Sequence, residues 1–194
     1  MRRTTRLIAS ALALAAVVAG GAVARSAAAA SASNKNWFPE QVHLKLTPST
    51  PQLAGCMPNV RVDVDVQLTT DKLGFDIFTV NAFNLPPNTT FTVFLLQQAG
   101  PPFGAAEYIG DFTSDWRGRS INTFKLIVQE AFSSTLVNGV RTRVDLNQVG
   151  AWFADPKGDD FCLGPNSPVT PFDGDGEAGV QAFNSANTTP LPAP

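Results

Sequence analysis

The amino-acid sequence predicts an all-β fold, a sandwich or barrel of about seven to eight antiparallel strands. Two observations carry this prediction. Apolar and polar residues alternate along several segments, and clusters rich in Gly, Pro, Asn and Asp separate these segments at fairly regular intervals. After the first 32 residues, strong amphipathic helix patterns are absent.

The clearest strand is predicted at residues 60–68. Its even-numbered positions are four valines and a leucine, and its odd-numbered positions are Arg, Asp, Asp and Gln. Alternate side chains of an extended chain point to opposite faces, so this segment presents one apolar and one polar face. Further strands are predicted at 42–46, 75–83, 90–97, 107–113, 120–129, 140–146 and 149–153.

The N-terminus has the layout of a secretory signal peptide. Three arginines among the first six residues precede an apolar, alanine-rich run at 7–18, and Ala-x-Ala cleavage options follow around 28–32. A membrane anchor is the alternative, since the apolar stretch 7–24 is just long enough. The small residues that follow favour cleavage, so we expect a secreted, extracellular chain without a membrane segment.

Three regions follow from this reading. They are a signal peptide at 1–32, a single domain at 33–183 and a disordered tail at 184–194.

The mature chain is acidic. Residues 1–32 contain four of the 14 Lys and Arg residues and none of the 16 Asp and Glu residues, which leaves a formal charge of −6. A negative domain repels nucleic-acid phosphates and anionic lipids, so we expect neither as a partner.

The two cysteines, Cys56 and Cys162, predict a disulfide bond in an oxidising compartment. Two buried free thiols are the alternative. The pair does not make a metal site by itself, because no Cys-x-x-Cys spacing occurs and His43 is the one histidine.

Residues 155–179 are dense in Asp, Gly and Pro and predict a long acidic loop region. Within it Asp173, Asp175 and Glu177 alternate with glycines, a pattern that suits the oxygen ligands of calcium. Further carboxylates for such a site stand at Asp155, Asp159 and Asp160. The alternative is a solvated acidic turn with no cofactor.

Trp116 and Arg117 lie in a predicted turn at 115–118. An exposed tryptophan beside arginines suits stacking on a sugar or anchoring a partner protein. The alternative is a tryptophan folded over the sheet edge with Arg117 packed against it.

The sequence offers little for catalysis, and we predict that the chain is not an enzyme. A serine triad needs a histidine, and His43 lies on a predicted strand with its side chain on the polar face. No G-x-S-x-G, H-E-x-x-H or phosphate-binding glycine motif occurs. A pair of carboxylates for glycoside hydrolysis stays open, because their separation in space is not readable from sequence.

Residues 85–93 read L-P-P-N-T-T-F-T-V, which resembles the L-x-P-x-T-x-Y-x-V signature of fibronectin type III domains. Phe91 stands where that signature has tyrosine, so a tyrosine corner would lack its hydroxyl. The resemblance implies an immunoglobulin-like antiparallel β-sandwich and no particular activity.

More broadly, the chain resembles secreted actinobacterial proteins, in its alanine-rich N-terminus and in the W-F-A-D-P and D-G-D-G-E stretches. That resemblance carries no assigned chemistry. We therefore predict a secreted, non-catalytic binding or structural module with a protein or glycan partner at the cell surface. The alternatives are a calcium-stabilised adhesion module and a hydrolase built on acidic residues.

Overall fold

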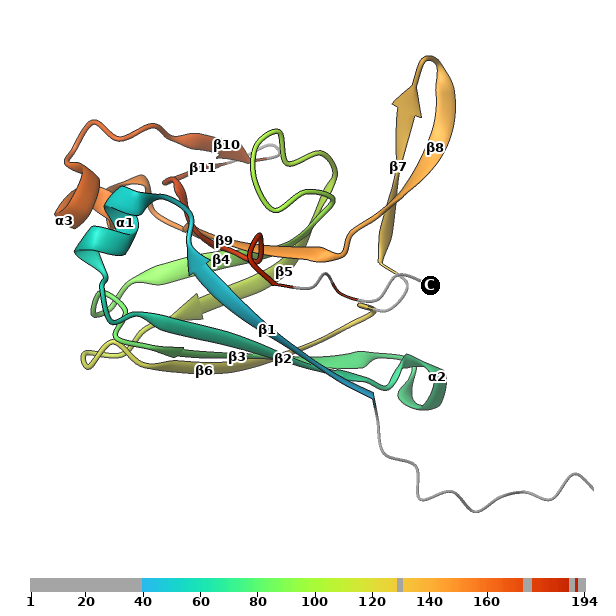
Figure 1. Cartoon of the computed structure of the whole chain (residues 1–194), viewed down its shortest axis with the longest axis horizontal. Helices are drawn as coiled ribbons and strands as arrows, with labels where there is room; N and C mark the ends of the chain where they lie inside the picture. Colours follow the sequence, from blue (N-terminus) through green and yellow to red (C-terminus); the bar gives the residue numbers. More distant parts are fainter. Residues whose placement is uncertain (1–39, 129–130, 173–175, 189–190, 192–194) are drawn as a thin grey trace, which may run out of the picture. The chain divides into compact units, whose positions relative to one another are not determined.

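The computed structural model describes residues 40–128, 131–172, 176–188 and 191, which form mainly antiparallel β structure (Figure 1). The strands are β1 (Glu40–Pro48), β2 (Arg61–Leu68), β3 (Asp76–Phe83), β4 (Thr90–Leu96), β5 (Ala106–Thr113), β6 (Ser120–Leu126), β7 (Phe132–Val137), β8 (Val140–Asp145), β9 (Gln148–Phe153), β10 (Thr170–Phe172), β11 (Gly176–Ala178) and β12 (Gln181–Asn184). Four short helices are α1 (Pro51–Cys56), α2 (Thr70–Leu73), the 3-10 helix η1 (Pro156–Asp159) and α3 (Asp160–Leu163). The predicted all-β class is confirmed. None of the helices in these ranges has the length and apolar character needed to cross a membrane.

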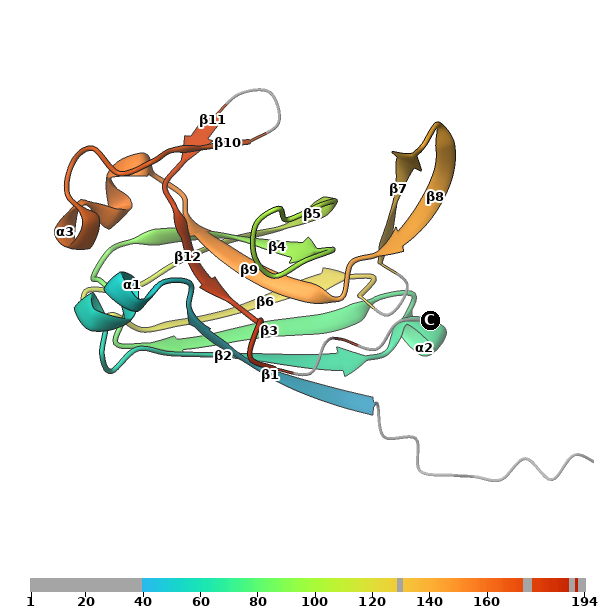
Figure 2. The ribbon, with the colours of Figure 1, turned by 45° about the horizontal axis from the view of Figure 1, so that its top comes forward.

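Eight strands form one sheet in the order β5-β4-β9-β12-β1-β2-β3-β6. Figures 1 and 2 show it folded into two layers, with β2, β3 and β6 in one and β4, β5 and β9 in the other. Strand β1 connects the layers, since residues 40–46 pair with β2 and Thr47 and Pro48 pair with β12. The end strands β5 and β6 also approach each other, so the sheet is nearly closed as a barrel. The β7–β8 and β10–β11 pairs are separate two-stranded sheets.

Gly110 of β5 lies where the barrel nearly closes. A Cβ atom at this position would lie 2.5 Å from the ring of Phe124 in β6. The absence of a side chain therefore allows β5 to pack directly against the aromatic ring of the opposite edge strand.

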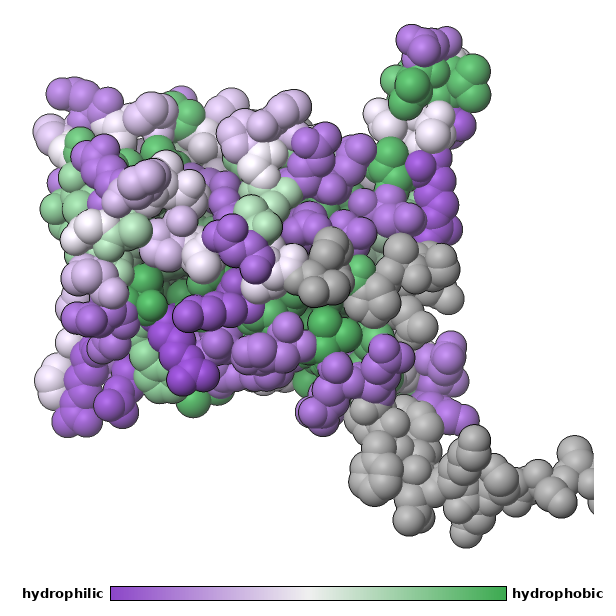
Figure 3. Space-filling view, in the orientation of Figure 1, coloured by the Kyte–Doolittle hydropathy of each residue, from purple (hydrophilic) through white to green (hydrophobic). Residues whose placement is uncertain are grey.

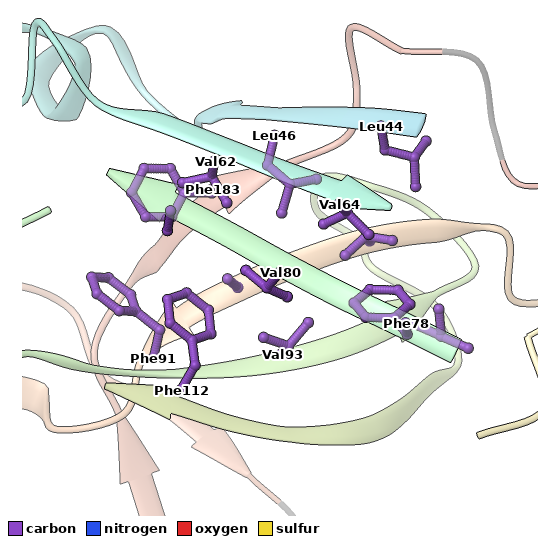
Figure 4. Packing of buried hydrophobic residues seen from close by; sticks show 14 of the residues in the cluster. Leu44, Leu46, Val62, Val64, Phe78, Val80, Phe91, Val93, Phe112 and Phe183 are labelled. Atoms are coloured by element: carbon purple, nitrogen blue, oxygen red, sulfur yellow. The ribbon is translucent and has the colours of Figure 1, made fainter. Parts of the chain in front are cut away.

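The inner faces of the two layers meet in one apolar core. Val62, Val64 and Val66 of β2 are fully buried, as the alternation in the sequence predicts. Figure 4 shows Val62 and Val64 of β2 on the opposite side of the core from Phe91 and Val93 of β4. The Phe91 ring lies at the centre of an aromatic cluster, with centroid distances of 5.2 Å to Phe112, 5.1 Å to Phe153 and 5.6 Å to Phe183. Each such pair contributes about 0.5–1.5 kcal/mol beyond the area it buries.

The predicted disulfide between Cys56 and Cys162 is confirmed, with Cα atoms 5.7 Å apart. It joins α1, which follows β1, to α3, which follows β9. Helix α1 has a local reason to form, because the Thr50 hydroxyl accepts a hydrogen bond from the Leu53 amide and Pro51 occupies the first helical turn.

The C-terminal part is more regular than the sequence predicts. Residues 155–179, expected as one long loop, contain η1, α3, β10 and β11. Of the residues in the predicted tail at 184–194, Asn184 belongs to β12, Ala186 and Asn187 are exposed, and 189–190 and 192–194 lie outside the described residues. Ser185 is fully buried and Leu191 is 2% exposed, with the Leu191 amide donating to the Asn147 carbonyl at 2.9 Å. A polar, proline-rich composition did not reveal these long-range contacts.

Candidate ligand-binding groove

The outer face of the β4–β9 layer is apolar. In β4, Phe91, Val93 and Leu95 point into the core, so Phe94 and Leu96 point outward between them. A second apolar cluster forms on this outer face, from Leu96, Trp152 and Ala178 with Phe94 and Phe103 packed against them. The strands are therefore apolar on both sides, unlike those of the opposite layer.

Four aromatic rings on this face pack edge to face. The centroid distance to the Trp152 ring is 5.5 Å from Phe94 and 4.9 Å from Phe103, with interplanar angles of 84° and 74°. Tyr108 continues the array, 5.8 Å from Phe94 at 66°. Trp152 is 2% exposed whereas Tyr108 is 57% exposed, so the array runs from a buried indole to an accessible phenol.

Gly150 makes room for the buried end of this array. A Cβ atom on Gly150 would lie 2.7 Å from Cδ1 of Leu96 and 2.8 Å from Cζ3 of Trp152. Contacts this short require the neighbours to move, so glycine at this position in β9 lets the indole lie directly over the strand.

A β-bulge positions the exposed end. Val93 pairs with Gly110 and Phe94 pairs with Tyr108, so Ile109 between them is the extra residue. The extra residue reverses the alternation and places Tyr108 and Asp111, three residues apart, on the same outer face. Burial raises the pKa of the Tyr108 hydroxyl, and the charge of Asp111 and a hydrogen bond to its carboxylate raise it further.

These side chains line a groove of about 730 Å³. Figure 2 shows β10 and the β7–β8 hairpin on either side of the layer formed by β4, β5 and β9. The lining residues are Thr92, Phe94, Leu96, Phe103, Gly104, Ala105, Ala106, Tyr108, Asp111, Ser133, Trp152, Thr170 and Pro171.

The β7–β8 hairpin projects beside the groove. Its turn is Asn138 and Gly139, both with positive φ (51° and 80°), which is the geometry that two-residue hairpin turns favour. Figure 3 shows apolar side chains near its end, and Leu136 and Val140 are 65% and 66% exposed.

The predicted Trp116 and Arg117 lie in the turn between β5 and β6. Trp116 is 68% exposed, and the Arg117 guanidinium carbon lies 4.2 Å from the centroid of its ring. Asp115 accepts hydrogen bonds from the amides of Arg119 and Arg117, which hold the pKa of its carboxyl below the usual value. Neither Trp116 nor Arg117 is among the residues that line the groove.

The calcium prediction is not decided. Asp173 and Asp175 lie outside the described residues, and Glu177 is exposed on β11 opposite Pro171. Within the described ranges, no group of three or more His, Cys, Asp or Glu residues is placed to hold a metal. Asp159 is fully buried and accepts hydrogen bonds from the Ser167 hydroxyl and, at 3.1 Å, the Val180 amide, so it anchors the C-terminal segment.

The opposite layer has a polar outer face. His43 is exposed there, as predicted, with Nδ1 2.8 Å from an oxygen of Asp65 and Nε2 3.5 Å from an oxygen of Asp63. Asn81 donates to the other oxygen of Asp65 at 2.9 Å. This His–Asp cluster lines neither the groove nor a second hollow of about 600 Å³ near the disulfide, where Lys157 is the one charged residue of the described lining.

The groove was not predicted from the sequence, in which Tyr108 and Trp152 lie within the predicted strands at 107–113 and 149–153. The sequence of β4 could have indicated it, because the outward-facing Phe94 and Leu96 alternate with the inward-facing Val93 and Leu95. A strand that is apolar on both faces needs a covering element or a ligand on its outer side. Comparisons of the chain with models of protein families, with curated proteins and with solved structures found no match.

Proposed function

We propose that this chain is an exported, non-catalytic binding module whose ligand occupies the aromatic groove. The observation that carries the proposal is the array of four aromatic side chains around a hollow of about 730 Å³, which has one carboxylate among its described lining residues. Ligand sites in proteins are typically concave, lined by apolar and aromatic side chains, and oriented by a few polar groups.

The groove is built on strands, which supports a binding role. Phe94, Tyr108 and Trp152 come from three neighbouring strands of the same sheet, and the bulge and Gly150 fix two of them in place. Side chains held this way lose little conformational entropy when a ligand binds.

Export is supported by the disulfide between Cys56 and Cys162 and by the signal-like pattern of residues 1–32. Within this proposal the two-layered domain acts as an immunoglobulin-like scaffold at the cell surface. The described residues hold no observation that favours the calcium-dependent adhesion module or the hydrolase over this role. In particular, among the described residues that line the two hollows, Asp111 is the one carboxylate.

An array of cell-surface glycans and peptides tests the proposal. We expect the oxidised chain to retain at least one ligand and Tyr108→Ala to lose it, because this change removes the exposed ring of the groove. Ile121→Ala is the matched control, since Ile121 is an apolar residue on β6 of the opposite layer and, at 69%, is at least as exposed as Tyr108. Retention by Tyr108→Ala with an unchanged melting temperature would place the binding site elsewhere.

A further inference from the structure

The described lining of the groove has a single formal charge. Among these residues Asp111 is the one carboxylic acid, and none of them is Lys, Arg or His. Burial raises the pKa of Tyr108, and the negative charge of this carboxylate and its hydrogen bond with the phenol raise it further. A ligand group with a positive charge therefore complements the groove.

The neighbouring hairpin keeps its own cations away from the groove. Ser133 lines the groove, and successive side chains of a strand point to opposite faces, so Ser134 and Leu136 lie on the other face. Arg143 pairs across the hairpin with Ser134 and Arg141 pairs with Leu136, which places both arginines on that other face. Neither arginine neutralises Asp111 from this position.

That other face of the hairpin shows how this chain holds a guanidinium. The Arg143 guanidinium carbon lies 4.1 Å from the centroid of the Phe132 ring, and its Nε lies 3.1 Å from an oxygen of Asp145. An aromatic face and a carboxylate thus hold one arginine together. The groove contains the same two partners, Tyr108 and Asp111, on one strand face.

We propose that the groove binds an arginine side chain from an extended peptide segment of a partner protein, with the guanidinium stacked on Tyr108 and paired with Asp111. This inference rests on the proposed function and names its ligand. A planar guanidinium matches both an aromatic face and the two oxygens of a carboxylate, whereas the ammonium of lysine is a strongly hydrated point charge. The hydroxyl of Tyr108 uses one acceptor site of Asp111, and a carboxylate has about four.

Titration of the oxidised chain with acetyl-Gly-Arg-Gly-amide, followed by NMR chemical shifts, tests the inference. The matched probes replace arginine by lysine or by citrulline, its neutral isostere. We expect the arginine peptide to bind about tenfold or more tightly than the citrulline peptide, with shifts at Phe94 and Tyr108. Asp111→Asn should remove this preference, and Glu107→Gln, which changes an exposed acid on the same strand outside the described lining, should leave it unchanged.

Equal binding of the arginine and citrulline peptides, or an arginine preference that survives Asp111→Asn, overturns the inference. A neutral oligosaccharide that binds in the groove and is unaffected by Asp111→Asn also overturns it, yet leaves the proposed function standing. If no array ligand and no peptide shifts a groove residue, both proposals fail.

Discussion

The two layers of the sheet are alike inside and different outside. On their inner faces β2 and β4 both supply fully buried apolar side chains, such as Val64 and Phe91. On the outer faces, β2 presents Asp65 in contact with His43, whereas β4 presents Phe94 in contact with the indole of Trp152. The apolar side chains of the inner faces therefore stabilise the fold, and the aromatic outer face distinguishes the layer to which we assign binding.

The two outer faces differ in the interactions that they make. Exposed polar contacts such as that of His43 and Asp65 contribute at most about 0.2–1 kcal/mol each and keep one face hydrated. The aromatic face leaves Tyr108 accessible beside a groove, which is typical of a surface retained for a partner.

Loss of the disulfide is expected to have the largest effect, because the bond joins the end of one layer to the end of the other. For a chain separation of 106 residues, the double change Cys56→Ala and Cys162→Ala should lower the free energy of unfolding by about 4–5 kcal/mol. Urea unfolding measures this loss. A loss below about 1 kcal/mol would mean that the layers hold together without the bridge.

Gly150→Ala should distort the aromatic face and leave the polar face unchanged. The added methyl group meets Leu96 and Trp152 at less than 3 Å, so we expect a loss of about 1–3 kcal/mol and a changed near-ultraviolet circular dichroism spectrum. Gly55→Ala in α1 is the control, since no atom lies within 4 Å of its added Cβ. A Gly150→Ala variant with native stability and spectrum would show that the side chains of this face move to accept the methyl group without loss of stability.

Asp65→Asn should have a small effect, because Asp65 and its partner His43 are both more than half exposed. We expect the free energy of unfolding, measured by thermal unfolding, to fall by less than about 1 kcal/mol. His43→Gln, which removes the partner of Asp65, should cause a similar loss. A loss above about 2 kcal/mol from either change would give the polar face a structural role that this comparison does not assign to it.

Tyr108 gives the groove a spectroscopic signal, because it is the one tyrosine of the chain. Its phenol should titrate above the ordinary value of 10.0, and Asp111→Asn should lower its pKa toward that value. As the pH rises, Tyr108 loses its proton in the unfolded chain before it does so in the folded chain. The free energy of unfolding should therefore fall as the pH rises above 10.0. Absorbance of the phenolate measures the titration. If the Asp111→Asn variant gave the same titration curve as the unchanged chain, Asp111 would have no influence on the pKa of Tyr108.

The sequence predicts those parts of the molecule in which one face is apolar and the other polar. The alternation in β2 identifies its buried side, and the turn residues around β3, β4 and β8 place the strand ends closely. The two cysteines of an exported chain identify the disulfide. These features are local, or follow from cysteine chemistry, and do not require knowledge of the neighbouring strands.

The groove was missed because it depends on long-range pairing. The bulge at Ile109 and the placement of Gly150 under Trp152 acquire meaning only when β5, β4 and β9 lie side by side. The hydrogen bond from the Leu191 amide to the Asn147 carbonyl was not predicted for the same reason. Short polar strands such as β7 also lack a hydrophobic period that a sequence pattern detects.

The most direct test of the account is to locate the bound ligand by NMR in the oxidised chain, with the tryptophan indoles as reporters. We predict that a ligand retained on the array shifts the signals of Trp152, Phe94 and Tyr108 and leaves that of Trp116 unchanged. A ligand that shifts Trp116, with Trp152 and Tyr108 unmoved, would place recognition in the β5–β6 turn and contradict the assignment of the aromatic groove as the binding face.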